Sequence, residues 1–270
     1  WGSFRRELER RPPDGDTRLM QLGGDMCRAA MFSVKDAMSL DRLGLGDRVS
    51  VQPLRLAGGL GLSTRLWLAI VVNDLMRQIF VYARGGTRPG AAIDPMYAAL
   101  GEELVRSAER PASDFRHRLL HVRWFSGEMQ RLAEKAARAF PWEGPPEAGT
   151  VFVSGDVLTK GNDFANGGLY GALFERGVRA IVEPNGDTLE SLAADHEHLV
   201  FGRGMSRAQA FALRRSMSWS RRRLYEAARR YQPWLPVPDV QGVLARPATL
   251  DRAINGTAPF AVRSVLYHWE

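Results

Sequence analysis

The sequence predicts an α/β protein in which parallel-sheet domains, Rossmann-like or flavodoxin-like, carry large helical insertions. The main reason is a segment of about 30 residues that runs strand, loop, helix, strand, which is the pattern of a βαβ unit with a right-handed crossover. Its two strands are apolar, β-rich stretches at 150–157 and 178–183. Long stretches with apolar residues at helical spacing fill much of the remaining chain and predict the insertions.

The first half of the chain predicts short strands between longer helices. Strands are expected at 19–22 and 48–54, and helices at 29–40, 65–82, 95–108 and 113–140. Ser63 or Thr64 is expected to cap the second of these helices. Pro95 is expected to open the third, directly after its cap Asp94.

The second half predicts the βαβ unit at 150–183, with its helix at 164–176, and two further helices at 188–196 and 206–231. The proline-rich segment 141–146 is the expected domain boundary. The predicted organisation is a polar lead-in at 1–18, a mixed α/β and helical domain at 19–143 that carries Cys27, and an α/β domain at 147–270. Because the chain begins with Trp1, we expect it to be a piece of a longer protein.

The composition is typical of a soluble globular protein, since 45% of the 270 residues are hydrophobic and 25% are charged. The best candidate for a membrane span, 66–80, is interrupted by Asn73, Asp74 and Arg77. We therefore expect no transmembrane helix and a cytoplasmic location. Cys27 is the only cysteine, so it excludes an intramolecular disulfide and cannot complete a metal site by itself.

Basic residues outnumber acidic ones, and the formal net charge is +7. Arginine supplies all but three of the 37 basic residues. Because guanidinium groups bind phosphate well, an acidic ligand such as coenzyme A is a candidate partner. The densest basic segment, 214–230, has apolar residues between its arginines. We therefore expect it to form one face of an amphipathic helix, not a phosphate-binding cradle.

The carboxyl end of the strand at 150–157 is the first candidate site, because ligands of open parallel sheets bind where strands end and helices begin. Gly155 lets the backbone approach a ligand, while Asp156 and Asn166 offer polar contacts. The alternative is a turn and a helix cap, in which Asn166 bonds the neighbouring backbone. Neither a Gly-x-Gly-x-x-Gly nor a Walker-type sequence occupies this segment, so a nucleotide-phosphate site is not expected.

Cys27 is the second candidate, since it follows two glycines and precedes a predicted helix. A helix N-terminus favours the thiolate form, which is the form that binds iron. The alternative is that Cys27 is a small buried apolar residue with no chemical role.

Four short segments, taken together, resemble a known family over residues 19–205. They are 24–32, which contains Met26-Cys27-Arg28; 58–62 with the helix after it; Arg88-Pro89; and 153–160 followed by Asp163–Asn166. In order and spacing they are similar to a Gly-Pro-Cys-Arg-Phe-Gly-like motif, a loop and Ala-Asp-Leu helix, an Arg-Pro turn, and a Val-Gly-Glu-Ile-Tyr-Val-Arg strand with a Pro-Phe-Ala-Asn helix start. These are motifs of the 2-hydroxyacyl-CoA dehydratase and acyl-CoA dehydratase activase-related family.

The resemblance implies an iron–sulfur component, or a fragment of one, in ATP-coupled dehydration of a 2-hydroxyacyl-CoA. In that family an ATP-dependent activator passes one electron to a cysteine-bound 4Fe-4S cluster, and the dehydratase then releases water. The chain would be a lyase of this kind or its electron-transfer activator, with an acyl-CoA and the activator as partners. Carried over by position, Cys27 is the cluster ligand, and Asp156, which replaces a glutamate, and Asn166 are the candidate catalytic residues. Gly155 lines the same cleft as a cofactor-binding residue. The further cysteines that such a cluster needs are absent from this sequence.

Two other functions stay open. One is a degenerate α/β scaffold or partner-docking module that kept the fold and has no cluster. The other, ranked last, is a basic nucleic-acid-binding protein, which the charge of +7 suggests. Slow reaction of Cys27 with thiol reagents would indicate the scaffold or docking module. Strong salt dependence of binding would indicate the nucleic-acid-binding protein.

Overall fold

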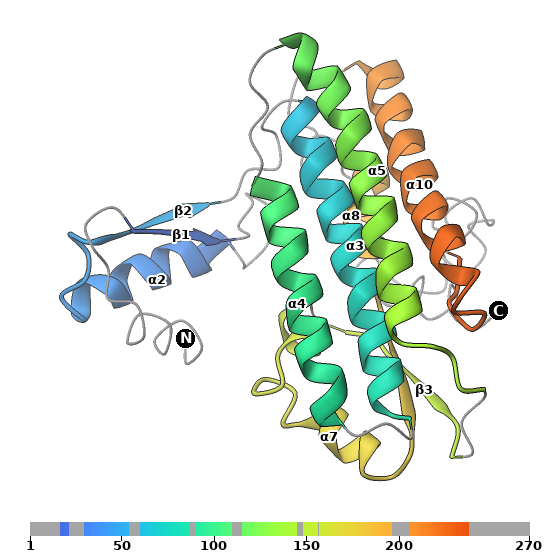
Figure 1. Cartoon of the computed structure of the whole chain (residues 1–270). Helices are drawn as coiled ribbons and strands as arrows, with labels where there is room; N and C mark the ends of the chain where they lie inside the picture. The colour runs from blue at the N-terminus through green and yellow to red at the C-terminus, as the bar shows by residue number, and fades with distance from the viewer. Residues whose placement is uncertain are drawn as a thin grey trace, which may run out of the picture. The chain divides into compact units, whose positions relative to one another are not determined.

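The structure is a computed structural model that describes residues 17–21, 30–53, 60–86, 90–109, 115–144, 148–155, 157–195 and 206–237. The chain divides into two compact units (Figure 1). Unit 1 comprises residues 1–58 and 197–204, and unit 2 comprises 59–196 and 205–270. Candidate ligand Cys27 and candidate catalytic residue Asp156 lie outside the described residues.

Unit 1 contains a small parallel sheet and one helix. Strands β1 (Thr17–Gln21) and β2 (Val49–Pro53) pair in parallel, with Thr17 opposite Val49, and α2 (Ala30–Arg42) connects them in sequence and packs on β2. The helix ends where Gly44 adopts a φ of +68°, a conformation that glycine tolerates best. Leu40 of the helix and Val49 of β2 are both buried. The bounds of both strands and of the helix agree with the predicted segments to within a few residues.

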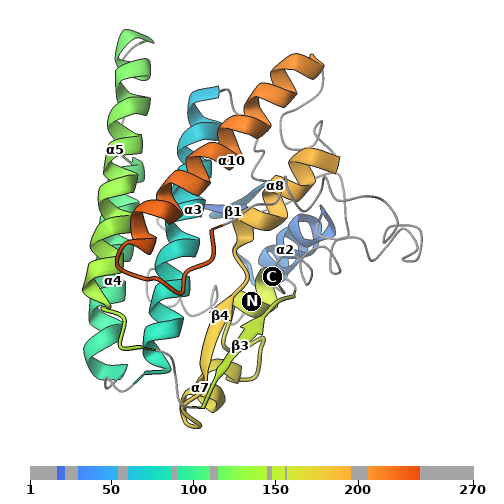
Figure 2. The same cartoon turned by 90° about the vertical axis from the view of Figure 1, so that its right-hand side faces the viewer.

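The described part of unit 2 contains four long helices that lie side by side in both views (Figures 1 and 2). They are α3 (Leu60–Arg84), α4 (Gly90–Glu109), α5 (Phe115–Ala139) and α10 (Arg207–Arg229). Helix α3 is central and contacts the other three. Its apolar residues recur every three or four positions, and Val71, Val72, Leu75 and Ile79 are fully buried.

Helix α3 contains the apolar run that was considered above as a candidate membrane span. From Thr64 to Arg84 it is long and apolar enough to cross a membrane by length and composition. Most of its apolar stretch, 61%, is buried inside unit 2, as in the core helix of a soluble protein. Asp74 and Gln78 are buried in this helix and find hydrogen-bond partners inside unit 2, whereas Asn73 is exposed.

The α/β part of unit 2 confirms the predicted parallel strand pair. Strands β3 (Thr150–Val153) and β4 (Arg179–Val182) run parallel, with Val153 opposite Val182. Between them lie the short helices α6 (Val157–Gly161) and α7 (Leu169–Phe174), and α8 (Asn185–Asp195) follows β4. Val182 and Ala180 are buried with Val81 and Tyr170, so α3 and α7 both contribute to the core beside this sheet.

The described residues are thus mostly helical, with their strands in parallel pairs, and this is compatible with an α/β class. The described strands form two separate two-stranded sheets. The segment 141–146, expected as the domain boundary, lies between α5 and β3, which both belong to unit 2. The reason is packing, because β4 lies against α3 and joins the sheet to the helices.

Several helix boundaries differ from the predictions. Helix α4 begins at Gly90 and contains Pro95, and α3 begins at Leu60, so neither begins at its predicted cap. In α4, Pro95 is the sixth residue, so its missing N–H removes one intrahelical hydrogen bond from the second turn. Helix α7 is shorter than predicted because Gly167 and Gly168 have positive φ angles directly before it.

Candidate functional site

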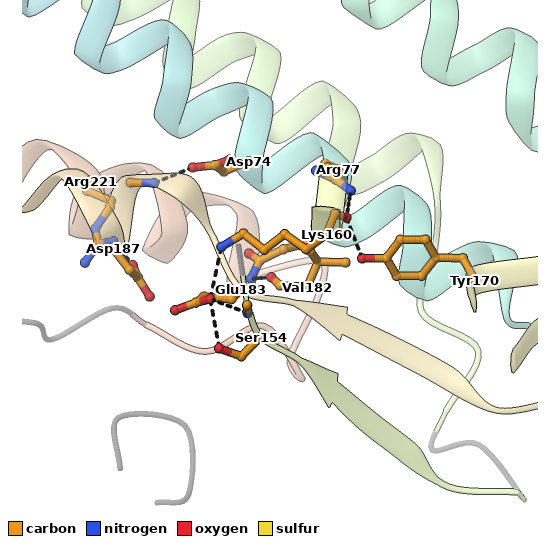
Figure 3. Close-up of polar contacts among 12 residues, drawn as sticks. Asp74, Arg77, Ser154, Lys160, Tyr170, Val182, Glu183, Asp187 and Arg221 are labelled. Atoms are coloured by element: carbon orange, nitrogen blue, oxygen red, sulfur yellow. Dashed lines mark hydrogen bonds and ion pairs between the residues drawn. The ribbon is translucent and has the colours of Figure 1, made fainter. Parts of the chain in front are cut away.

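A buried carboxylate lies at the carboxyl ends of β3 and β4, the edge at which parallel sheets bind ligands. Ser154 directly follows β3, and Glu183 directly follows β4. Glu183 Oε2 accepts hydrogen bonds from Ser154 Oγ at 2.9 Å, from the Gly155 backbone N–H at 3.3 Å and from Lys160 Nζ at 3.0 Å (Figure 3). The Glu183 N–H donates to Val153 O at 2.9 Å, so the strand ladder itself holds this carboxylate beside the end of β3.

Lys160 lies in the interior although lysine is seldom buried without a partner. The side chains of Lys160 and Glu183 are only 2% and 5% exposed. The Lys160 carbonyl accepts a hydrogen bond from Tyr170 Oη at 2.8 Å and another from the Arg77 guanidinium (Figure 3). The carboxyl end of α6 is therefore tied to α7 and α3, which explains how a five-residue helix can position a buried ammonium group.

A second chain of hydrogen bonds fixes the end of β4. Gln78 on α3 donates from Nε2 to Val182 O at 2.8 Å, and Tyr225 on α10 donates from Oη to Gln78 Oε1 at 2.9 Å. All of these groups are buried, where each unmade hydrogen bond is costly. Val182 immediately precedes Glu183, so α3 and α10 together determine the position of the site carboxylate.

The side chain of Asp74, on α3, lies against the N-terminus of α8. Its Oδ2 accepts a hydrogen bond from the Gly186 N–H at 2.7 Å, and a carboxylate at a helix N-terminus interacts favourably with the helix dipole. Burial nevertheless raises the pKa of Asp74 to about 6, against the opposing effects of the Gly186 and Asn185 N–H groups and of the Lys160 and Arg221 charges. Asp74 can therefore change its protonation state near neutral pH.

Arg221 forms the other charged centre of the interior. It is 1% exposed, and its guanidinium contacts Asp187 and lies 2.9 Å from Glu190 Oε2. Ser218 Oγ donates a hydrogen bond to the other carboxylate oxygen of Glu190. The prediction that this arginine belongs to a basic surface face is wrong for Arg221, because its position on α10 faces α8 and the acidic residues there.

The arrangement around Glu183 has a definite chemical capacity. An ammonium group, a hydroxyl group and a backbone N–H converge on one anionic oxygen, and such donors also bind carbonyl and anionic oxygens of ligands. Ser154 and Gly155 are exposed, whereas Lys160 and Glu183 are buried. Solvent therefore reaches the cluster from the side of Ser154 and Gly155.

Of the two predicted site residues that the structure describes at this edge, Gly155 contacts Glu183 and Asn166 does not take part in the cluster. Gly155 takes part directly through its N–H, and its φ of +145° with open space around it suits glycine. Asn166 caps its own turn, because its Oδ1 accepts hydrogen bonds from the Gly168 and Leu169 N–H groups, both at 3.1 Å. This is the cap that the sequence offered as the alternative for Asn166.

Sequence reasoning did not identify Lys160 or Glu183 as site residues. A signal for each was present. Lys160 is one of only three lysines in an arginine-rich chain, and Glu183 directly follows a predicted buried strand. Asp74 interrupts an apolar run in the helix that resembles the Ala-Asp-Leu motif, and a carboxylate in such a run needs a buried partner.

A cluster of four irons does not fit the donor atoms of this chain alone. Such a cluster is held by about four ligands, usually thiolates, and the sequence contains the single thiol of Cys27. Within the described residues, no group of three or more His, Cys, Asp or Glu side chains could hold a metal ion. Further thiolates would have to come from another chain or another part of the protein.

Comparisons of the chain with protein-family models, with curated proteins and with solved structures found no match. Any functional proposal therefore rests on the residues of the site and on the motif resemblance.

Proposed function

We propose that the chain is a component of an ATP-coupled 2-hydroxyacyl-CoA dehydratase/activase system, and that the Ser154–Glu183 edge of unit 2 binds the acyl part of the substrate. Two observations support this role. The resembling segment 153–160 spans the end of β3, the Gly155 turn and α6, so the motif and the polar cluster coincide. The cluster also lies where parallel sheets bind ligands.

The observation that carries the proposal is the convergence of three donors on one oxygen of Glu183. A 2-hydroxyacyl thioester offers a carbonyl oxygen that can accept from Ser154 and Gly155, and a hydroxyl that can donate to Glu183. Loss of water requires a proton for the leaving hydroxyl and a base for a proton of the neighbouring carbon. The Lys160 ammonium and the Glu183 carboxylate form an acid–base pair of this kind, 3.0 Å apart.

The role assigned to Cys27 is narrower. It is proposed as one ligand of a cluster whose remaining thiolates come from a partner or from adjoining sequence, because this chain has no second cysteine. When bound, such a cluster would supply the electron for the reaction. Surface arginines are the groups suited to the phosphates of coenzyme A.

Substrate binding is the first test. The chain is titrated with a 2-hydroxyacyl-CoA and with coenzyme A alone, and the heat of binding is measured. We expect Ser154→Ala to weaken binding of the acyl-CoA about tenfold, because one donor to the substrate carbonyl is lost. Ser126→Ala, a change on α5, is the matched control and should leave the affinity unchanged. Equal affinities for Ser154→Ala and the unchanged chain would overturn the assignment of this edge.

The cluster is tested separately. The full-length protein, together with its activator, is reconstituted anaerobically with iron and sulfide and followed by visible absorbance and electron paramagnetic resonance. We expect a cluster signal that Cys27→Ala removes. A signal of equal size in the Cys27→Ala protein, or none in either, would exclude a cluster ligated by Cys27.

A second candidate function is a cluster-free scaffold or partner-docking module. The observation in its favour is that the buried charges pair with one another, Lys160 with Glu183 and Arg221 with Glu190, as in a structural network. This function predicts no acyl-CoA binding and slow reaction of Cys27 with thiol reagents in the folded protein.

A further inference from the structure

The solvent face of α10 concentrates positive charge. The helix and its C-terminal cap residue carry six exposed arginines and a single acidic residue, Glu226, and these arginines are Arg207, Arg215, Arg222, Arg223, Arg229 and Arg230. This one face thus holds most of the formal charge of +7. Arg222 is paired with Glu226 at 2.9 Å.

Two large aromatic side chains lie among these arginines. Phe211 is 58% exposed and Trp219 is 62% exposed. Phe211, Arg215, Trp219 and Arg222 recur every three or four residues, so they form one stripe along the helix. The Arg223 guanidinium lies over the Trp219 ring, 5.4 Å from its centre. Contiguous exposed apolar surface rimmed by polar residues marks interaction sites, and here two exposed rings lie in one stripe with cations.

The helix presents this stripe on a rigid support. Its opposite face buries Met217, Leu224 and Tyr225 against unit 2, and α10 contacts α5, α3 and α8. At its start, Ser206 and Gln209 form a reciprocal capping box. The core contacts of α10 are therefore made by residues other than Phe211 and Trp219, and the packed helix holds these two exposed residues in place.

We propose that this face of α10 binds single-stranded nucleic acid, with arginines contacting phosphates and bases stacking on Phe211 and Trp219. Guanidinium groups match phosphate oxygens in geometry and charge. Aromatic side chains accept any base by stacking, which suits a strand bound without sequence preference. Along the helix axis, Arg215 lies about 6 Å from Phe211 and from Trp219, so cation and ring alternate on the scale of a nucleotide step.

The same pattern speaks against two other occupants. An anionic membrane needs a continuous apolar face that enters the lipid, but here arginines separate Phe211 from Trp219, and the apolar face of α10 is already buried in unit 2. A second copy of the chain would bring like charges together on the two arginine-rich faces. The surface also shares no residue with the Ser154–Glu183 edge, so the two proposals can fail independently.

The test measures binding of a fluorescently labelled oligothymidylate and an oligouridylate to the full chain by anisotropy at several salt concentrations. Trp219→Ala and Phe211→Ala should each weaken binding about fivefold to a hundredfold, the loss expected for one stacked base. Trp219→Phe should retain most of the affinity. Arg215→Ala should reduce the slope of log affinity against log salt by about 0.7, the value for one phosphate contact on a single strand.

Matched controls lie on other elements of unit 2. Phe164, in the turn before α7, is 86% exposed, and Arg106 on α4 is exposed beside Glu102. Phe164→Ala and Arg106→Ala should leave the affinity unchanged. Circular dichroism checks that each variant is folded.

Three outcomes would overturn the proposal. The first is equal binding by the Trp219→Ala protein and the unchanged chain, with heparin competing as well as the oligonucleotide, which would show charge attraction without stacking. The second is preferential, Trp219-dependent binding to phosphatidylglycerol vesicles. The third is an equal loss in the Phe164→Ala control, which would show that the α10 face is not the site.

Discussion

Lys160 and Glu183 form an ion pair in which both side chains are almost inaccessible to solvent, with Nζ 3.0 Å from Oε2. The pair joins α6 to the end of β4 and so closes the βαβ unit at its carboxyl edge. Removing two charges from water is costly, and the cost is recovered only while both partners are present. The pair therefore couples the integrity of the site to the stability of unit 2.

Replacing one partner of this pair should be strongly destabilising. We expect Lys160→Met to lower the free energy of unfolding by about 3–5 kcal/mol, because it leaves the Glu183 carboxylate buried without its cation. The double change Lys160→Met with Glu183→Gln should recover most of this loss, since the amide is neutral and still accepts from Ser154. Urea denaturation of the three proteins measures both effects.

The exposed pair of Arg106 and Glu102 is the control for this comparison. Its side chains are 67% and 73% exposed, so Arg106→Met should cost less than about 1 kcal/mol. A similar small loss for Lys160→Met would mean that water reaches Glu183 in solution and that the pair is not buried.

Two adjacent arginines of α10 should respond very differently to the same change. Arg221 is buried between Asp187 and Glu190, whereas its neighbour Arg222 is exposed and pairs with Glu226 on the surface. We expect Arg221→Met to cost about 3–5 kcal/mol of unfolding free energy and Arg222→Met less than about 1 kcal/mol. Thermal or urea unfolding of the two variants in parallel measures the difference, and equal losses would contradict the buried position of Arg221.

The contrast between Arg221 and Arg222 also shows what could be predicted from the sequence. A helix at 206–231 follows from its apolar spacing, and α10 indeed spans Arg207–Arg229 with Ser206 as its cap. Position 221 lies on the same face as Met217 and Leu224, so its burial was accessible from periodicity. The identity of its partners was not, because Asp187 and Glu190 belong to another helix and only tertiary packing brings them close.

The site shows the same division. The parallel β3–β4 pair and the functional importance of its carboxyl edge follow from local pattern and from a general property of parallel sheets. Gly155 was identified on that basis. The charge pair was not, because Lys160 and Glu183 come together only once α6 folds back against the end of β4. Asn166 is predicted to line the site, whereas its side-chain oxygen accepts from the Gly168 and Leu169 N–H groups of its own turn.

The hydroxyl of Tyr225 should contribute through Gln78. It donates to Gln78 Oε1, and Gln78 in turn donates to Val182 O. We expect Tyr225→Phe to lower the free energy of unfolding by about 1–3 kcal/mol, because it leaves a buried amide oxygen without its donor. Tyr231→Phe, which changes a more exposed tyrosine just after α10, should have a negligible effect on urea denaturation. No difference between the two variants would contradict the Tyr225–Gln78 hydrogen bond.

Asp74 should give unit 2 a distinctive pH dependence. Its pKa is raised from 3.8 to about 6, chiefly by burial, so the folded protein holds this proton more tightly than the unfolded chain does. Between about pH 4 and pH 6 the unfolded chain binds fewer protons at this position, and the free energy of unfolding must therefore fall as the pH rises. Below that window both states are protonated, and above it both are ionised, so the contribution becomes constant.

The variant Asp74→Asn isolates this effect, because asparagine does not titrate and its side-chain oxygen can still accept from the Gly186 N–H. We expect the unfolding free energy of the variant, minus that of the unchanged protein, to rise by about 2.5 kcal/mol between pH 4 and pH 7, because the unfolded carboxyl is already partly ionised at pH 4. Any constant loss from the substitution cancels in this difference. A flat curve for Asp74→Asn would mean that Asp74 is ionised in the folded protein throughout this range.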